Sequence, residues 1–244
     1  MKLQIIAIAL CMSCGATKAD VLVFAAASLK EPVDAVADGF EDVVVSYGGS
    51  GTMARQVSLG APADVILLAN DEWMHVLVTN GHVAPESVIE FASNSLVLIA
   101  PAGSADVPLQ APPMLQALNG GRIATGLTTA VPAGIYAKAA LQSLDLWTSL
   151  QNQLAEVDNV RAALALVARG QSPLGIVYTS DARVSPAVEV VATFPADSHP
   201  TFRYQAALTK NAGPEAAAFL AALTGAVGQE HLADAGFLPS VVAR

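Results

Sequence analysis

Short apolar runs alternate with helical patterns along this chain, and that alternation limits its fold more than any other feature. In the first third, expected strands and helices take turns at 21–25, 29–39, 43–47, 52–59, 64–69 and 71–80. Continuous apolar strands separated by helices are typical of a parallel sheet that helices cover on both faces. The sequence therefore predicts an α/β fold.

A second series of the same kind follows a Pro- and Gly-rich stretch that ends at Pro113. Its expected elements are strands at 121–126, 174–178 and 188–193, helices at 133–143 and 160–169, a strand near 202–208, and terminal helices at 214–224 and 227–235. Two sheets joined by two extended crossovers predict two lobes with a cleft and a hinge. We expect lobe 1 to comprise 20–98 plus 206–244, and lobe 2 to comprise 99–205.

Residues 1–19 have the layout of a cleavable signal peptide. Lys2 precedes an apolar stretch, and the small residues of Gly15–Ala19 offer a cleavage site before Asp20. The mature protein is therefore expected in the periplasm. The 2 cysteines, Cys11 and Cys14, both lie in this segment, so the mature chain must rely on its own core. A tethered lipoprotein is an alternative, although neither cysteine has the Leu-x-Ala/Gly-Cys site that it would need.

The charge balance limits the partners. Lys2 and Lys18 leave with the signal peptide, so the net charge falls from −9 to −11. An acidic surface argues against nucleic acid and anionic membranes as partners. No apolar run of the mature chain reaches the roughly 18 residues of a membrane span, so direct membrane insertion is not expected. A site built from neutral dipoles can still hold an anion.

Four expected helix starts offer such dipoles. They lie at Ser28, at Ser50–Thr52, at Val131–Gly134 and at Asp158–Arg161. The first turn of a helix has backbone N–H groups without intrahelical partners, and these favour an anion. We expect the four helix starts to converge on one ligand.

Each of these signals also has a purely structural interpretation. Ser28-Leu-Lys-Glu31 has the spacing of a capping box, in which Ser28 closes its own helix. Pro132 suits the first position of any helix, and Asn159 is an ordinary N-cap residue. Tyr178 ends an expected buried strand, where a tyrosine either packs in the core or donates its phenol into a cleft.

Enzyme motifs are scarce. Gly48-Gly-Ser50-Gly-Thr52 lacks the last glycine of a nucleophile elbow. The histidines, which have no spacing for zinc or a catalytic triad, are His75, His82, His199 and His231. Dinucleotide and P-loop motifs are missing from the sequence. We expect no catalytic residue, no bound metal cation and no cofactor. A serine hydrolase with Ser28 or Ser50 as nucleophile is a second hypothesis.

Six motifs resemble one known family. They are Phe24-Ala-Ala-Ala-Ser-Leu29, Ala61-Pro-Ala-Asp64, Val131-Pro-Ala-Gly-Ile-Tyr-Ala-Lys138, Val160-Arg-Ala-Ala-Leu-Ala-Leu-Val167, Pro173-Leu-Gly-Ile-Val-Tyr178 and Phe194-Pro-Ala-Asp-Ser-His199. Together they are similar to the periplasmic molybdate-binding proteins of molybdate ABC importers, from the first strand nearly to the C-terminus. The resemblance implies a bilobed type 2 periplasmic binding protein with two mixed or parallel sheets. It also implies a monomer without enzymatic activity that delivers its ligand to a membrane permease.

In this family two serine hydroxyls, a tyrosine phenol and backbone amides hold molybdate or tungstate between the lobes. The matching motifs place the hydroxyls on Ser28 and Ser50, the amides on Ala133 and Val160, and the phenol on Tyr178. The choice of molybdate rests on the resemblance alone. A sulfate-type oxyanion receptor of the same architecture is the alternative, because the sequence does not measure the size of the cavity.

The chain departs from the family pattern in two places. Gly48, Gly49 and Gly51 replace the Ser-rich residues that usually surround the second serine, which puts secondary hydroxyl contacts in doubt. The glycines also leave the backbone bare for close approach. The segment 127–130 replaces an Asp-Pro pair, a change that could alter how the loop before Ala133 is held.

Overall fold

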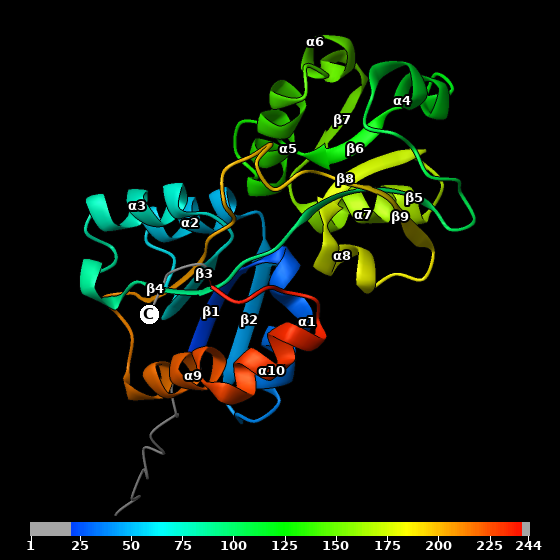
Figure 1. Cartoon of the computed structure of the whole chain (residues 1–244). Coiled ribbons are helices and arrows are strands. Elements are labelled where there is room, and N and C mark those ends of the chain that lie inside the picture. Colours follow the sequence, from blue (N-terminus) through cyan, green and yellow to red (C-terminus); the bar gives the residue numbers. More distant parts are fainter. Residues whose placement is uncertain (1–20, 241–244) are drawn as a thin grey trace, which may run out of the picture.

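The computed structural model describes residues 21–240, which form two lobes with a five-stranded sheet each (Figure 1). The sheet of lobe 1 has the strand order β2-β1-β3-β10-β4, and the sheet of lobe 2 has the order β7-β6-β8-β5-β9. The expected bilobed α/β fold with two mixed sheets is confirmed. The expected signal peptide lies outside the described residues.

Within residues 21–240, each lobe combines its five strands with five α-helices. The strands of lobe 1 are β1 (Val21–Ala26), β2 (Val43–Gly48), β3 (Val65–Leu68), β4 (Ile89–Ala92) and β10 (Tyr204–Leu208). Its helices are α1 (Lys30–Ala37), α2 (Ser50–Ser58), α3 (Asp71–Thr79), α9 (Pro214–Thr224) and α10 (Ala226–Asp234). The strands of lobe 2 are β5 (Leu96–Pro101), β6 (Ile123–Gly126), β7 (Leu154–Val157), β8 (Leu174–Tyr178) and β9 (Val188–Thr193). Its helices are α4 (Ala111–Leu118), α5 (Pro132–Ser143), α6 (Trp147–Leu150), α7 (Val160–Ala168) and α8 (Thr179–Arg183).

Each sheet contains one strand that arrives from the other lobe and runs against its neighbour. In lobe 1, β1 is parallel to β2 and β3, whereas β10 is antiparallel to β3. In lobe 2, β6 is parallel to β7 and β8, whereas β5 is antiparallel to β8. The apolar runs did not reveal this reversal, because a central strand is buried on both faces whichever way it runs.

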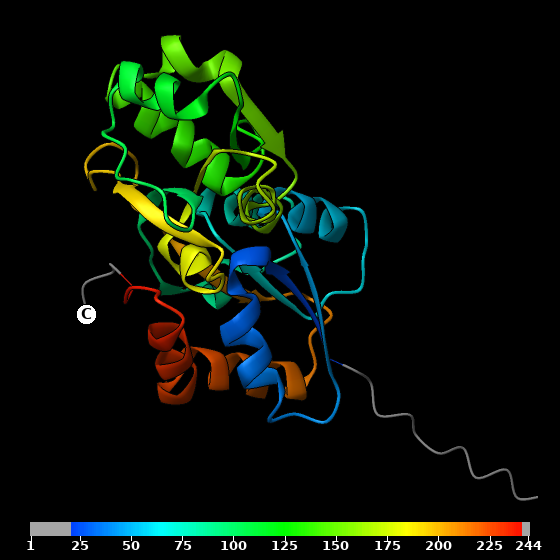
Figure 2. The ribbon, with the colours of Figure 1, turned by 90° about the vertical axis from the view of Figure 1, so that its right-hand side faces the viewer.

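Helices cover both faces of each sheet, which explains the continuous apolar strands. In β3, Val65 and Leu67 pack in the core beneath α1 and α9, while Ile66 and Leu68 pack against α2 and α3. In lobe 2, α4, α5 and α6 lie on one side of the sheet and α7 and α8 on the other (Figure 1). Seen from the side, α9 and α10 lie at the end of the molecule away from lobe 2 (Figure 2). Every helix within 21–240 is too short or too polar to cross a bilayer.

Some expected boundaries and elements need correction. The sheets place the crossovers at 93–95 and 194–203, so the expected boundaries after residues 98 and 205 fall inside β5 and β10. Strands β4 and β7, of four residues each, were not predicted, because so short a run shows little periodicity. The Pro-rich stretch contains the start of α4, with prolines in its first turn, where no N–H is needed.

Candidate functional site

All five predicted site residues line one pocket between the lobes. Ser28 and Ser50 reach it from lobe 1, and Ala133, Val160 and Tyr178 reach it from lobe 2. Each of the five is at most 4% exposed. The cavity volume is about 10 Å³, close to the roughly 10–15 Å³ that a single water molecule needs. The pocket therefore suits a small ligand that both lobes contact.

The pocket wall carries no charged side chain among the described residues. Its other members are small, apolar or amide-bearing residues, namely Ala26, Ala27, Gly48, Gly49, Ala69, Val131, Pro132 and Asn159. An anion in this pocket would meet hydroxyl and backbone dipoles rather than lysine or arginine. Helix starts supply such dipoles with their positive ends toward the ligand.

Ser50 is the first residue of α2 and follows the N-cap Gly49. Its Oγ accepts a hydrogen bond from the Ala69 N–H at 3.0 Å. A serine hydroxyl has one proton and two lone pairs, so this bond leaves the proton free to donate. The backbone thus holds the hydroxyl as a donor for the pocket.

Ser28 does not form the capping box that its spacing suggested. It lies in a 3₁₀ turn, Ala27–Leu29, before α1, whose N-cap is Leu29 without a side-chain hydrogen bond. Glu31, the other half of the expected box, reaches Arg161 instead. The Ser28 Oγ lies 3.0 Å from the Tyr204 Oη. Either hydroxyl can donate in this pair, and burial raises the pKa of Tyr204 well above its usual value, so its phenol stays protonated.

Ala133 and Val160 lie in the first turns of α5 and α7. Backbone N–H groups at these positions have no partner within the helix. Pro132 occupies the first position of α5, where the helix does not need a backbone N–H group. Asn159 caps α7 as expected, because its Oδ1 accepts from the Ala162 N–H at 2.9 Å. This cap uses the amide of Ala162, so the amide of Val160 remains available to a ligand.

Tyr178 ends β8 with a buried phenol. The ring packs edge-on against Phe202 and Tyr204, with centroids 5.3 and 6.0 Å away. The Tyr178 Oη makes no hydrogen bond of acceptable geometry with the described residues. Burial, and then the neighbouring Tyr204, raise the pKa of this phenol, so it stays protonated. The Tyr204 phenol lies within reach of this hydroxyl but is poorly aligned with it, so a ligand oxygen in the pocket would give the Tyr178 hydroxyl a better acceptor.

The lobes touch each other around the pocket. The Trp73 Nε1 of lobe 1 donates to the Ala130 carbonyl of lobe 2 at 3.0 Å. A Cβ on Gly51 would lie 2.7 Å from that same carbonyl oxygen, and a Cβ on Gly49 would overlap the Asp158 carbonyl oxygen. The close approach that these glycines permit is therefore an approach of one lobe to the other.

Comparisons with known proteins agree with this geometry. A family model described as bacterial extracellular solute-binding protein matches residues 21–238. The chain belongs to this family. The description of this family names the binding of a solute rather than catalysis.

Individual relatives show which solute-binding proteins this chain is similar to. Molybdate-binding protein ModA of Escherichia coli (strain K12) is 44% identical over 203 residues, which cover 80% of this chain and 79% of that one. The structure of the Azotobacter vinelandii periplasmic molybdate-binding protein matches with a TM-score of 0.75 at 24% identity and covers 92% of this chain and 100% of that chain. The sulfate-binding protein SubI of Mycobacterium tuberculosis H37Rv matches with a TM-score of 0.71 at 19% identity and covers 91% and 87%. The resemblance read from the motifs is thus confirmed, while the two structural matches show the fold alone.

The serine-hydrolase hypothesis finds no support in this solute-binding protein. A serine nucleophile needs a general base within hydrogen-bond reach. Ser50 instead faces the Ala69 amide, and Ser28 faces the phenol of Tyr204. No histidine or carboxylate of the described chain lines the pocket. The described residues also contain no group of three or more His, Cys, Asp or Glu side chains placed to hold a metal ion.

Sequence reasoning missed the residues just behind the pocket. Tyr204 is separated from Ser28 by 176 positions, and Arg161 is separated from Glu31 by 130. No local spacing connects such pairs. The sheet of lobe 1 brings Tyr204 of β10 close to Ser28, and the contact between the two lobes brings Glu31 to Arg161. Arg161 was visible solely as a member of the Val160 motif, and nothing in that motif indicates where its side chain points.

Proposed function

We propose that this solute-binding protein captures molybdate, and also tungstate, in the periplasm and delivers it to the permease of an ABC importer. The observation that carries the proposal is a buried, uncharged pocket lined from both lobes by Ser28, Ser50, Ala133, Val160 and Tyr178. The identity to a relative named for molybdate binding supports the choice of ligand. Periplasmic location depends on export through the expected signal peptide.

The mechanism we propose is binding without chemistry. Two serine hydroxyls, one phenol and the amides of α5 and α7 donate hydrogen bonds to a tetrahedral dianion, whose charge the helix starts also compensate. A protonated oxyanion such as hydrogen phosphate needs an acceptor for its O–H group. Without one it loses about 1–3 kcal/mol in a dry pocket. The same uncharged donors therefore favour anions that are free of protons.

The proposed function requires neither catalysis nor a resident cofactor or metal cation, since molybdenum enters only as the oxyanion ligand. We infer that the protein acts as a monomer whose lobes close over the ligand, and that the closed shape is what the permease recognises. Nucleic acid and direct membrane insertion have no part in this function.

Competition among oxyanions tests the choice of ligand. A ligand that binds only the folded protein raises the unfolding temperature according to its concentration and affinity. In thermal-shift titrations we expect molybdate and tungstate to raise this temperature at concentrations where sulfate and phosphate do not. A larger shift with sulfate would establish the sulfate-type receptor instead. The absence of a shift with all four anions would overturn oxyanion capture.

Replacing Tyr178 with phenylalanine should lower the affinity for molybdate and leave the stability of the unliganded protein nearly unchanged. The variant loses one donor to a charged ligand, so molybdate binding should weaken by about 1–3 kcal/mol. The unliganded protein should keep its stability within about 1 kcal/mol, because the hydroxyl that is removed makes no well-aligned hydrogen bond. Calorimetric titration and chemical denaturation measure the two quantities.

Tyr47→Phe is the matched control, because the Tyr47 Oη donates to the Asp34 Oδ1 at 2.5 Å and lies outside the pocket. It should keep full affinity and lose some stability. If Tyr178→Phe kept full affinity, the phenol would not belong to the site.

Ser28→Ala tests the donor contributed by lobe 1. The alanine keeps the turn but removes the hydroxyl, so molybdate affinity should fall by about 1–3 kcal/mol. Ser87→Ala is the control, since the Ser87 Oγ donates to the Ala84 carbonyl at 2.8 Å and lies away from the pocket. Calorimetry on both variants measures the difference, and equal affinities would remove Ser28 from the site.

A further inference from the structure

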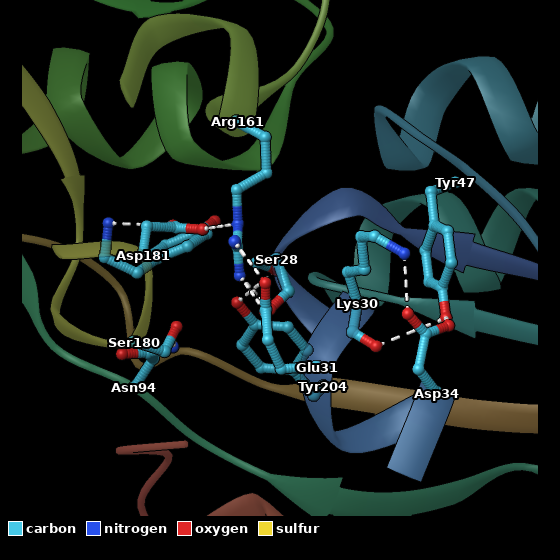
Figure 3. A network of polar contacts seen from close by, with 11 residues as sticks. Ser28, Lys30, Glu31, Asp34, Tyr47, Asn94, Arg161, Ser180, Asp181 and Tyr204 are labelled. Carbon is cyan, nitrogen blue, oxygen red and sulfur yellow. Dashed lines mark hydrogen bonds and ion pairs between the residues drawn. The ribbon is translucent and has the colours of Figure 1, made fainter. Parts of the chain in front are cut away.

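Arg161 stands directly beside the pocket without lining it. It is the second residue of α7, next to Val160, and its side chain is 18% exposed. The Arg161 Nη1 donates to the Glu31 Oε1 at 2.8 Å, and its Nη2 donates to the Glu31 Oε2 at 2.5 Å (Figure 3). This bidentate pairing is the strong and directional form of the arginine–carboxylate contact.

These contacts join the two lobes. Glu31 belongs to α1 of lobe 1, and the Ser28 carbonyl, also in lobe 1, accepts from the Arg161 Nη2 at 3.2 Å. On its other side Arg161 pairs within lobe 2, where its Nε lies 2.5 Å from the Asp181 Oδ1. Separating the lobes would break the bonds to Glu31 and Ser28 and leave the pair with Asp181 intact. The guanidinium would thus remain held near its closed-state position when the lobes are apart.

Arg161 also connects three of the five predicted site residues. Val160 precedes it in the chain, and Ser28 accepts from it through the backbone carbonyl. The link to Tyr178 runs through Asp181, whose Oδ2 accepts from the Tyr178 N–H at 3.2 Å. A displacement of the guanidinium would therefore move hydrogen-bond donors of both lobes, Ser28 on one side of the pocket and Tyr178 on the other.

Two carboxylates pair with the guanidinium, and neither of them lines the pocket. Asp181 is fully buried, and burial raises its pKa to about 6 although the neighbouring Arg161 acts in the opposite direction. The side chain of Glu31 is 41% exposed, so water can take its place as the hydrogen-bond partner of Arg161. A partner of this kind can separate and re-form as the lobes move, whereas the Asp181 pair stays in place.

We propose that Arg161 is a positioning residue of the binding site and that its bidentate pair with Glu31 is a latch between the lobes, which forms on closure and slows ligand release. The proposal rests on the proposed capture of molybdate for its kinetic consequence only. The latch itself is a property of the two lobes, so it is also testable without any ligand.

The kinetic test compares Glu31→Gln with Asp34→Asn. The control residue lies on the same helix and pairs with Lys30 at 2.6 Å inside lobe 1. Trp73, at the contact between the lobes, provides a fluorescence signal for closure. In stopped-flow measurements on the mature protein, Glu31→Gln should release molybdate about three- to tenfold faster with an unchanged association rate. Asp34→Asn should change neither rate. An unchanged release rate in Glu31→Gln, with molybdate bound normally, would overturn the latch.

The second test measures the distance between the lobes without ligand. Residues 21–244 contain no cysteine, so spin labels can be attached through Leu59→Cys in lobe 1 and Gln151→Cys in lobe 2, at exposed positions. Glu31→Gln should shift the distance distribution toward the open form, while Asp34→Asn should leave it unchanged. Identical distributions in all three proteins would overturn the latch. Failure of the unsubstituted protein to bind molybdate would contradict the proposed function, and the distance measurement would still decide the inference.

Discussion

Replacing Gly49 with alanine is expected to weaken molybdate binding about a hundredfold or more while both lobes stay folded. The new Cβ would overlap the Asp158 carbonyl oxygen of the opposite lobe. A backbone atom yields less readily than a side chain, and overpacking of this kind costs about 1–3 kcal/mol or more. Gly49 has an ordinary extended conformation, with φ −67° and ψ 138°, so alanine fits when the lobes are apart. The overlap therefore costs free energy when the two lobes close, and not when each lobe folds.

Calorimetric titration measures this loss, and thermal unfolding without ligand checks that the lobes are intact. Gly213→Ala is the matched control, because its Cβ would meet only the Glu215 Oε2, at 3.5 Å. It should leave molybdate affinity unchanged. Full affinity in Gly49→Ala would show that ligand binding does not require the lobes to meet at this point.

Replacing Arg161 with methionine is expected to destabilise the protein by about 3–5 kcal/mol at pH 8, since one partner of a buried ion pair is removed. The Asp181 carboxylate, which is 0% exposed, would lose its counter-charge. Its folded-state pKa is already raised from 3.8 to about 6, chiefly by burial, and loss of Arg161 would raise the pKa further. A group with a raised folded pKa takes up a proton in the folded state first as pH falls. The variant should therefore recover stability between pH 8 and pH 5.

Urea denaturation at the two pH values measures this difference. Lys30→Met removes an exposed ion pair, with side chains 53% and 42% exposed, and should stay within about 0.5 kcal/mol of the parent protein at both. Adding Asp181→Asn to Arg161→Met should restore most of the stability at pH 8. An equal loss at both pH values would show that the buried carboxylate is not its cause.

Much of the site could be predicted because its parts are local. Ser50, Ala133 and Val160 lie where a strand or loop leads into a helix, and the sequence marks such points with glycine, proline or a capping residue. Tyr178 is different, because a strand-end tyrosine is equally typical of a core. Only the family resemblance selected it as a ligand donor. Its Oη makes no well-aligned hydrogen bond with the described residues, which supports that choice on separate grounds.

What could not be predicted depends on contacts between the lobes. The capping box at Ser28 failed because Glu31 forms a stronger bidentate pair with Arg161 than it would form with a backbone amide. The roles of Gly49 and Gly51 were predicted only in part. The sequence indicated that another group comes close to their backbone, and the structure shows that this group is the opposite lobe. Local spacing carries no information about either partner.

The most direct test of binding by neutral donors is a crystal structure of the mature protein grown with molybdate, with molybdenum located by its anomalous scattering. We expect a single molybdenum peak in the pocket, with oxygens in hydrogen-bond reach of the hydroxyls of Ser28, Ser50 and Tyr178 and the amides of Ala133 and Val160. The guanidinium of Arg161 should stay on Glu31 and Asp181. A peak outside this pocket, or a lysine or arginine side chain in contact with the anion, would contradict binding by uncharged donors.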